Sequence, residues 1–374
     1  MSVIQFSCEK TLLKNAISVA SPAVAAKSSI PALAGLLIQA NSQELTISGF
    51  DMQTGIRTHV SASVAQEGEV VLDTRLFSDI VRSLPDDMVT FTADERLMVH
   101  LSCGESDFDI LGISAADYPD LPEVEDVYSV SIQQKVLRSM IEETAFAVST
   151  NESRPIHTGA LFEVGSDGLT MAAVDGFRLA VRREPLEKVE GGAFSFVAPG
   201  SALNEVKKIC ADAEEGAEIT LGKRHILFTV GDTELICRRL EGDFLDYRNA
   251  IPRKNPISVV VEAKTLTESI DRVSVMISDK LKSPVRCRFD HDKVYLSAKT
   301  GNGEAKDVCR VSGDGGGLEI GFNNRYLMEA LRYAPADTVR IELNTGISPA
   351  VIVPVEGEEK FLYMVLPVRL KNEA

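Results

Sequence analysis

The chain has 374 residues, 44% hydrophobic and 25% charged, which predicts two or three domains because one domain typically holds about 150 residues. Its formal net charge of −16 excludes a protein that grips nucleic acid by overall attraction, since neutralising phosphates requires clustered Lys and Arg. No apolar run approaches the roughly 18 residues of a membrane span and no secretory signal opens the chain, so we expect a soluble cytoplasmic protein.

Segments with the apolar spacing of amphipathic helices recur along the chain. In chain order they are EKTLLKNAISVAS (9–21), DTRLFSDIVRSL (73–84), QQKVLRSMIEETAF (133–146), GSALNEVKKICADA (200–213), EAKTLTESIDRVSVMISDKLK (262–282) and NNRYLMEALRYA (323–334). The first, third and fifth follow a β-type stretch and start alike, with Lys10, Lys135 and Lys264. The others precede an acidic or proline-containing turn and a strand. This alternation predicts three structural repeats.

Short β-branched or alternating runs between these helices predict antiparallel strands. They are LTISGF, VVLDT, LMVHLS, FSFVAP, HILFTV, SVVVEA and KVYLSA, bounded by Gly, Asn and Asp. The segments ISAADYPDLP (113–122) and LEGDFLDYRNAIP (240–252) predict exposed connectors into the next repeat. We therefore predict an α+β fold of three repeated domains, 1–125, 126–253 and 254–374, each with two helices packed on antiparallel sheets.

The charge is distributed unevenly between the predicted helices and the rest of the chain. The six helical segments hold 14 basic and 12 acidic residues, net +2, which leaves 25 basic and 43 acidic residues elsewhere. Any single helix of this kind is compatible with an ordinary solvated face. Six such helices with a summed charge of +2 favour a weakly positive surface built from helices.

Motifs that carry catalysis or hold cofactors are missing from the sequence. It has no P-loop, HExxH, GxSxG or strand-linked GxGxxG, and the glycine-rich SGDGGG (312–317) is interpreted as a flexible turn. Six scattered cysteines and five histidines show no metal-ligand spacing. We expect no catalytic residues, no cofactor and no metal.

Three segments carry a resemblance to a known family. AAVDGFRLAV (172–181), LEGDFLDYRNAIP (240–252) and FLYMVLPVRL (361–370), in this order within three repeats, resemble the β subunit of bacterial DNA polymerase III, the sliding clamp. The resemblance implies a non-catalytic processivity factor whose subunits form a ring-shaped homodimer around duplex DNA. It also explains the charge, since a ring held by topology needs only a weakly positive lumen.

The resemblance implies positions for contacts with duplex DNA and between subunits. The DNA contacts would be Lys27, Arg75, Arg82, Asn151 and Arg154. The dimer interface would pack Phe108 and Ile110 of one subunit against Val275 and Met276 of the other. Gly200 and Ser201 stand where relatives often carry basic residues, which argues against uniform transfer of DNA contacts.

The resemblance also implies a hydrophobic groove for short linear peptides. Its residues would be Val174, Gly176, Phe177, Arg178, Leu179, Leu245, Asn249, Ala250, Met364, Leu366, Pro367, Val368 and Arg369. Met364, Leu366 and Leu179 would be exposed anchors, while Arg178 and Arg369 would orient polar groups of the peptide. Phe177 replaces a frequent His and Asn249 a frequent Arg, which predicts an altered peptide preference. From residues alone, VDGFRLAV and YMVLPVRL are equally compatible with plain core strands.

The partners implied are duplex DNA, a second copy of the chain, the replicative polymerase catalytic subunit, the clamp loader, and other polymerases and repair proteins with short clamp-binding motifs. Two alternatives stand beside this hypothesis. A repeat-built hydrolase would need polar residues concentrated in one repeat, and the sequence shows no such asymmetry. A clamp paralogue or non-encircling scaffold that binds peptides would share the groove but would not be retained on DNA.

Overall fold

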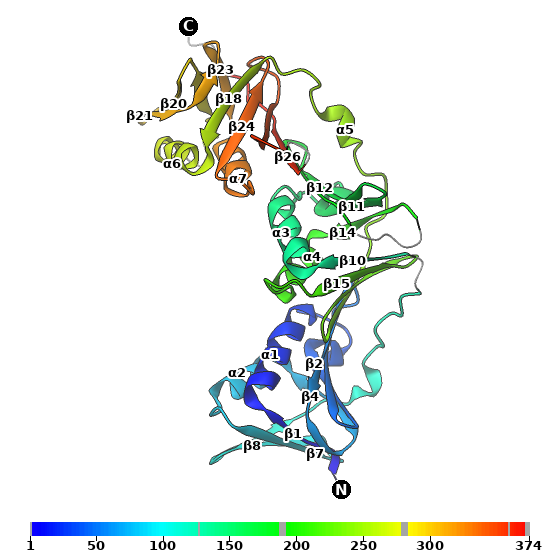
Figure 1. Ribbon diagram of the computed structural model, residues 1–374. Helices are drawn as coiled ribbons and strands as arrows, with labels where there is room; N and C mark the ends of the chain where they lie inside the picture. Colours follow the sequence, from blue (N-terminus) through cyan, green and yellow to red (C-terminus); the bar gives the residue numbers. More distant parts are fainter. Residues whose placement is uncertain (1, 126–127, 187–191, 278–282, 358–359, 371–374) are drawn as a thin grey trace. The chain divides into compact units, whose positions relative to one another are not determined.

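The structure, a computed structural model, describes residues 2–125, 128–186, 192–277, 283–357 and 360–370 (Figure 1). Contacts within the chain divide it into two compact units. The first comprises Met1–Arg138 and Asn204–Arg239, and the second comprises Ser139–Leu203 and Leu240–Ala374. Both units are built from antiparallel sheets and helices, as the strand and helix patterns predict.

The first unit contains a five-stranded and an eight-stranded sheet. The smaller has the order β5 (Ser63–Gln66), β1 (Ser2–Glu9), β7 (Met88–Asp94), β8 (Met98–Cys103) and β9 (Ser106–Leu111). The larger has the order β10 (Tyr128–Gln133), β15 (Gly216–Leu221), β16 (His225–Val230), β17 (Thr233–Arg238), β4 (Thr54–Ser61), β3 (Glu44–Phe50), β2 (Gly35–Asn41) and β6 (Gly68–Asp73). Its β4–β17 pair, with Thr58 opposite Thr233, joins two predicted repeats into one sheet.

Helices α1 (Lys10–Ala20) and α2 (Thr74–Ser83) pack beside each other and cover the core of this unit. Leu13 and Ile17 lie one helical turn apart and are buried with Phe77 of α2. Phe77 meets the ring of Phe91 edge-on at 6.4 Å between centroids. Their burial is the reason that these segments form helices with one apolar stripe.

The start of α2 provides a test of helix capping. The Asp73 carboxylate accepts a hydrogen bond from the Leu76 N–H at 2.7 Å, whereas Glu9, in the same place before α1, makes no side-chain cap bond. We expect Asp73→Ala to lower the free energy of unfolding by about 1 kcal/mol, because one orphan N–H loses its partner. The matched Glu9→Ala should change it by much less. Denaturant unfolding of both variants measures the difference, and equal losses would contradict the capping role.

The second unit contains a nine-stranded and a four-stranded sheet. The larger has the order β14 (Phe194–Pro199), β11 (Gly159–Gly165), β12 (Gly168–Val174), β13 (Arg178–Glu184), β26 (Phe361–Val365), β25 (Ala350–Pro354), β24 (Thr338–Leu343), β18 (Ile257–Glu262) and β22 (Ser312–Asp314). The smaller has the order β21 (Gly303–Arg310), β20 (Lys293–Thr300), β19 (Val285–Phe289) and β23 (Leu318–Phe322). The β13–β26 pair, with Leu179 opposite Met364, repeats the junction seen at β4–β17.

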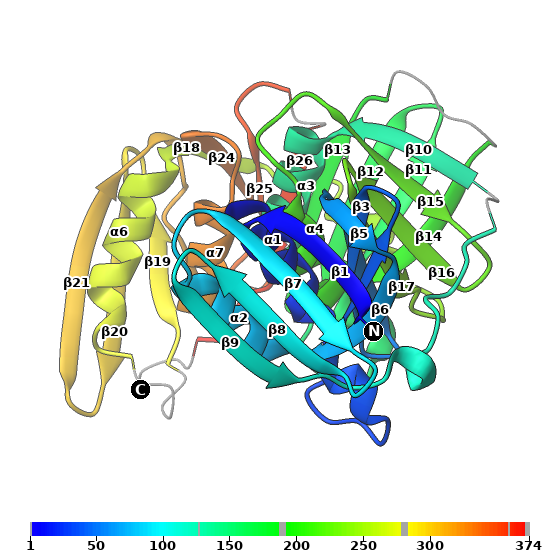
Figure 2. The ribbon, with the colours of Figure 1, turned by 90° about the horizontal axis from the view of Figure 1, so that it is seen from below.

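Helices α6 (Ala263–Ser274) and α7 (Asn324–Arg332) pack against each other, and α6 also lies along β20 and β21 (Figure 2). Two further helices, α3 (Gln134–Ala145) and α4 (Gly200–Ile209), begin where the sequence predicts. Two predicted helices are too long. The segment 200–213 ends at Ile209, and the segment 262–282 ends at Ser274, where a turn closed by Met276 N–H to Val273 O follows. Residues 278–282 of that prediction lie outside the described residues.

The two predicted connectors are anchored rather than fully exposed. Tyr118 follows the short helical turn Ala115–Asp117, is buried, and donates its hydroxyl to Ser48 O at 3.3 Å. Tyr247 opens the short helix α5 (Tyr247–Ala250), is buried, and donates to Glu163 Oε2 at 2.7 Å. The prediction of exposed connectors is therefore wrong at both tyrosines. Each ring supplies apolar area and a polar tip that finds a partner.

The glycine-rich segment SGDGGG also differs from its prediction. Ser312–Asp314 forms strand β22, which pairs with Ser258–Val260 at the end of the nine-stranded sheet. Only Gly315–Gly317 make the turn, and two of them, Gly316 and Gly317, have positive φ. A flexible turn is the wrong interpretation of the first three residues, because the sheet supplies a partner strand that the sequence pattern does not reveal.

Candidate functional site: a groove beside α7 and exposed cationic positions

The segment AAVDGFRLAV forms the hairpin between β12 and β13 in the second unit. The Asp175 carboxylate accepts the N–H of Phe177 at 2.9 Å and of Arg178 at 3.1 Å, and Gly176 adopts a φ of 90° that favours glycine. This turn leaves the Phe177 side chain 59% exposed at its tip. The sequence therefore places an aromatic ring in solvent by local turn chemistry.

The segment after β26 is pinned against this hairpin. The Leu366 N–H donates to Phe177 O at 2.9 Å, and the Val368 N–H donates to Gly321 O at 2.8 Å. Pro367 between them has a fixed φ and no N–H to satisfy. The backbone is thus held on both sides of Pro367.

A groove of about 630 Å³ lies between this pinned segment and the start of α7. Four of the predicted groove residues line it: Phe177, Leu366, Pro367 and Val368. The sequence-based prediction missed the remaining lining residues, which are Ile277, Ser283, Pro284, Asn323, Asn324, Arg325 and Tyr326. The volume of the groove falls within the range of ligand pockets, and the groove is lined mostly by apolar residues with a few polar groups.

The signal that would have found the missed wall lies in NNRYLMEALRYA. Asn323 caps α7 by accepting the Tyr326 N–H at 3.3 Å, so Tyr326 stands in the first turn of the helix. An aromatic residue at that position, on a helix whose apolar stripe is formed by Leu327 and Leu331, is a candidate for a surface contact.

A second set of predicted groove residues forms a buried floor next to the groove. Val174, Leu179 and Met364 are buried in one cluster with Tyr247, and Leu366 packs against it. The expectation of exposed anchors is wrong for Leu179 and Met364, because paired central strands bury the side chains on this face. Both interpretations of VDGFRLAV and YMVLPVRL therefore hold in part, as core strands whose ends reach a groove. Leu366, only partly buried, belongs to both.

The other predicted groove residues, apart from Arg178, are solvent-exposed. Gly176 lies in the hairpin turn, and Leu245, Asn249 and Ala250 lie on or next to α5. The Asn249 amide donates to Asp246 Oδ2 at 2.7 Å. Arg369 is exposed after the pinned segment. None of them lines the groove beside α7, so their role in binding stays a prediction.

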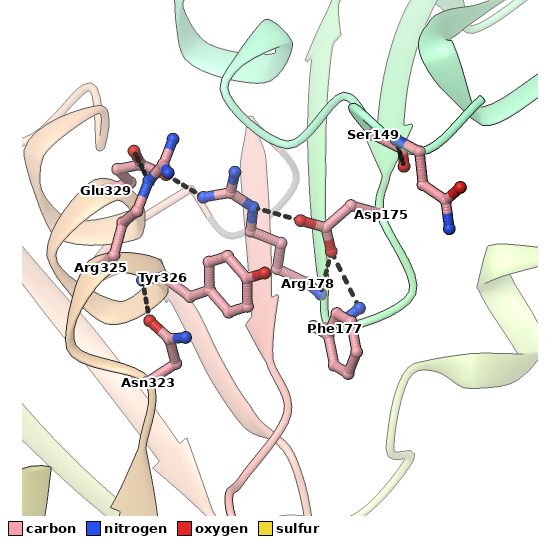
Figure 3. A network of polar contacts seen from close by, with 9 residues as sticks. Ser149, Asp175, Phe177, Arg178, Asn323, Arg325, Tyr326 and Glu329 are labelled. Carbon is pink, nitrogen blue, oxygen red and sulfur yellow. Dashed lines mark hydrogen bonds and ion pairs between the residues drawn. The ribbon is translucent and has the colours of Figure 1, made fainter. Parts of the chain in front are cut away.

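Arg178 does not face solvent as the sequence-based prediction requires. Its side chain is 6% exposed, and its guanidinium pairs with Asp175 at 2.9 Å and with Glu329 of α7 (Figure 3). Glu329 also accepts from Arg325 Nε at 3.0 Å. Burial by itself raises the pKa of Glu329, but the hydrogen bonds from Arg178 and Arg325 outweigh it and lower the pKa. This burial contradicts the expectation that Arg178 orients polar groups of a peptide directly.

The predicted DNA contacts are exposed in both units. In the first, Lys27 lies in a loop, and Arg75 and Arg82 lie on α2, each within 4.0 Å of Asp79. In the second, Asn151 and Arg154 lie in the loop before the helical turn Pro155–Thr158. The ion pairs with Asp79 are solvent-exposed and therefore weak, so both arginines are available to a stronger anion.

Two of the three lysines at the predicted helix starts, Lys10 and Lys135, pair with carboxylates of the chain itself. Lys10 Nζ lies 2.6 Å from Asp86 and Lys135 Nζ lies 2.7 Å from Glu214, so each ties the first helix of a predicted repeat to the turn after the second. These hydrogen bonds lower the pKa of both carboxyl groups. The repeated lysine thus marks the same structural contact in two of the three predicted repeats.

The predicted dimer residues lie on an end strand and just after a helix. Phe108 and Ile110 belong to β9, the end strand of the five-stranded sheet, and are partly buried against the core. Val275 and Met276 follow α6, and Val275 is 83% exposed. Phe108 and Ile110 belong to the first unit, and Val275 and Met276 to the second.

Within the described residues no group of three or more His, Cys, Asp and Glu side chains could hold a metal ion. All six cysteines are buried and unpaired with one another, and burial raises the pKa of Cys237 and Cys287 to about 12. None of them is thus a ready nucleophile. In the same described part of the chain, no helix is long and apolar enough to span a membrane.

Family models of the DNA polymerase III beta subunit match the chain three times: the N-terminal domain at residues 4–122, the central domain at 131–246 and the C-terminal domain at 248–369. The beta sliding clamp of Staphylococcus aureus is 29% identical over 98% of this chain and 100% of its own. The solved sliding clamp from Bacillus subtilis is 27% identical with a TM-score of 0.93 over 99% and 100% of the two chains. The Pseudomonas aeruginosa clamp bound to griselimycin is 26% identical with a TM-score of 0.92 over 98% and 100%.

These matches confirm the predicted fold of three clamp domains and the predicted absence of enzymatic activity, because the relatives are non-catalytic sliding clamps. The domain boundaries at 125 and 253 and the individual contact residues stay predictions. Because the N-terminal, central and C-terminal family models follow one another along nearly its whole length, the chain belongs to the DNA polymerase III beta subunit family, the bacterial sliding clamps.

Proposed function

We propose that two copies of this chain close head-to-tail into a ring around duplex DNA and tether replication proteins to it. In this proposal the three domains are 1–125, 126–253 and 254–374, and the ring works in the cytoplasm. The tethered proteins are the replicative polymerase catalytic subunit, the clamp loader, and other polymerases and repair proteins that carry short linear motifs.

The observation that carries the proposal is a pair of sheet margins. Strand β9 ends one sheet and β21 ends another, and apolar side chains accompany both: Phe108 and Ile110 lie on β9, and Met276, which follows the highly exposed Val275, lies beside Gly303 of β21. A contact between β9 of one copy and β21 of the next joins two different surfaces. Two such heterologous contacts can close a two-member ring.

Charge supports this pairing. Asp107 and Asp109 are exposed on β9 beside His100; on β21, Lys306 pairs with the exposed Glu304 at 3.1 Å, and Arg310 is an exposed cation. Opposite charges at the margins would steer the two copies together and fix their register. Identical charges on both margins would oppose it.

The exposed positions predicted to contact DNA, four of them cationic, support a lumen that binds DNA only weakly. Lys27, Arg75, Arg82, Asn151 and Arg154 offer donors to phosphates, whereas the chain as a whole carries a net charge of −16. Such a distribution suits a surface that guides DNA without holding it tightly. A ring needs nothing stronger, because topology retains it.

The groove beside α7 supports the tethering. It offers apolar surface from Leu366, Pro367 and Val368 next to the exposed Phe177 ring, which suits a short peptide with apolar anchors. The Pseudomonas aeruginosa clamp is bound to a ligand, griselimycin, so a relative of similar fold has a ligand site. We infer that the groove here is the partner site.

Leu366→Ala tests the groove. We expect the affinity for a labelled polymerase-tail peptide to fall by about 1–2 kcal/mol, because Leu366 joins the groove to the buried floor as an interface hot spot would. Fluorescence titration measures it. The control is Ile347→Ala, an exposed apolar residue outside the groove, which should bind as the parent does. Unaltered affinity of Leu366→Ala in a folded protein would place the peptide site elsewhere.

A further inference from the structure

The Arg178 guanidinium pairs with two carboxylates of the chain itself, through Nε and Nη1. It lies between the carboxylates of Asp175, in the β12–β13 hairpin, and Glu329, in the second turn of α7. Glu329 is itself held by Arg325, which lines the groove. These ion pairs tie the hairpin to the helix at a site that is nearly closed to solvent.

The same guanidinium also contacts two aromatic rings. It lies 4.6 Å from the centroid of the Tyr326 ring and 5.5 Å from that of Phe146. The Tyr326 ring in turn stacks with Phe177, with 6.0 Å between centroids and 20° between planes. The Tyr326 ring therefore lies between the buried Arg178 guanidinium and the exposed Phe177 ring (Figure 3).

We propose that Arg178 is a positioning residue of the groove: it holds the Tyr326 ring beside Phe177 and so builds an aromatic wall, without touching the bound peptide itself. This inference rests on the proposed peptide-binding function for its ligand. The aromatic wall would select a partner motif with an aromatic anchor, because offset ring stacking rewards one beyond its buried area.

The geometry requires a planar cation at this position. Arg can pair with two carboxylates through separate N–H groups and still lay its flat face against a ring, whereas the Lys ammonium is a compact point charge. Arg178→Lys retains the charge between Asp175 and Glu329 but loses the planar contact with Tyr326. An ion pair that merely stabilises the fold would tolerate that change better than a wall of oriented rings.

Two labelled peptides and three variants test the proposal. The first peptide carries one aliphatic and one aromatic anchor, and the second has Ala in place of the aromatic anchor. The variants are Arg178→Lys, Glu329→Gln and the control Glu143→Gln, which makes the same carboxylate-to-amide change at the buried pair with Arg182 on the same strand. Arg182 does not line the groove.

We expect Arg178→Lys and Glu329→Gln to weaken binding of the aromatic peptide by up to about tenfold, the order expected when the peptide's aromatic anchor loses one ring-stacking contact with a displaced Tyr326 ring. Their affinity for the Ala peptide should stay at the parent value. Glu143→Gln should leave both affinities unchanged. Parent-like binding of the aromatic peptide by Arg178→Lys and Glu329→Gln would overturn the proposal, and so would an equal loss with both peptides.

A fluorescent reporter measures how well the aromatic wall of Phe177 and Tyr326 is ordered when no peptide is present. The sequence contains no Trp, so Phe177→Trp places a single indole where Phe177 stacks on Tyr326. Adding Arg178→Lys should increase acrylamide quenching of that indole, while adding Glu143→Gln should not. If the parent chain binds neither peptide, the proposed function fails, and the quenching alone then decides the role of Arg178: equal quenching in both backgrounds would refute it.

Discussion

A Val275→Asp variant should sediment as a monomer at concentrations where the parent chain is a dimer. Val275 is 83% exposed in the single chain, so the substitution leaves the core intact. In the proposed ring the same side chain faces Phe108 and Ile110 of the partner copy. Burying an unpaired carboxylate there should cost on the order of 3 kcal/mol, which raises the dimer dissociation constant more than a hundredfold.

Ile347→Asp provides the matched control for this experiment. Ile347 is an apolar residue of the same unit that is 74% exposed, and the proposal gives it no place in the interface. That variant should remain dimeric by analytical ultracentrifugation. A dimer of unchanged stability in Val275→Asp would show that the subunits meet through another surface.

The second large effect is expected at Arg182. This buried arginine pairs with Glu143 at 2.6 Å and with Glu184, and donates to the carbonyls of Arg183 and Lys360 at 2.7 and 3.1 Å. Arg182→Ala leaves two carboxylates and two carbonyls without their donor. The free energy of unfolding should fall by about 3–5 kcal/mol, the usual cost of breaking a buried ion pair.

The loss in Arg182→Ala should depend on pH in a defined direction. Burial raises the pKa of Glu143 in the folded parent, against the opposing effect of Arg182. Without Arg182 the folded pKa rises further above the unfolded value. Stability from a carboxyl with a raised folded pKa is present below the unfolded pKa and is lost as the pH rises through the folded pKa. The variant should therefore be least impaired near about pH 4 and most impaired near about pH 7.

Urea unfolding of the parent and Arg182→Ala across this pH range measures both the loss of unfolding free energy and the direction in which that loss changes with pH. Arg75→Ala serves as the control, because Arg75 makes a largely exposed pair with Asp79 and its loss should cost no more than about 1 kcal/mol. A deficit in Arg182→Ala that grows toward acid pH would contradict the assignment of Glu143.

Local patterns in the sequence predict the repeated elements well. Each helix start agrees to within about a residue, because an amphipathic stripe and a preceding strand define it locally. Helix ends are less well defined. Nothing in the run after Ile209 forbids a further turn, and the helix stops there because the Ala211 N–H is satisfied by the Gln134 side chain, 77 residues away.

In the candidate site, too, features set by local sequence could be predicted and features set by tertiary packing could not. The hairpin that exposes Phe177 could be predicted, because Asp175 and Gly176 determine its turn locally. The wall formed by Tyr326 could not, since it depends on packing between segments about 150 residues apart in sequence. Arg178 shows the same limit: its charge suggests a ligand contact, and only the fold reveals that Asp175, Glu329 and two rings already occupy it.

The family membership of the chain is independent of whether it encircles DNA, so encirclement needs its own measurement. Contact energy and topology differ in their response to salt. Roughly six phosphate contacts would lower affinity by on the order of a thousandfold between about 50 and 200 mM salt, whereas a threaded ring should be far less sensitive.

The protein is therefore loaded onto nicked circular DNA with a clamp loader and ATP, passed over a sizing column in moderate salt, and the circle is then cut once. We predict that the protein stays with the circle and is lost after linearisation, because a ring leaves only where the duplex ends. Equal retention on circular and linear DNA would contradict encirclement, and absence from both would indicate a peptide-binding scaffold that does not enclose DNA.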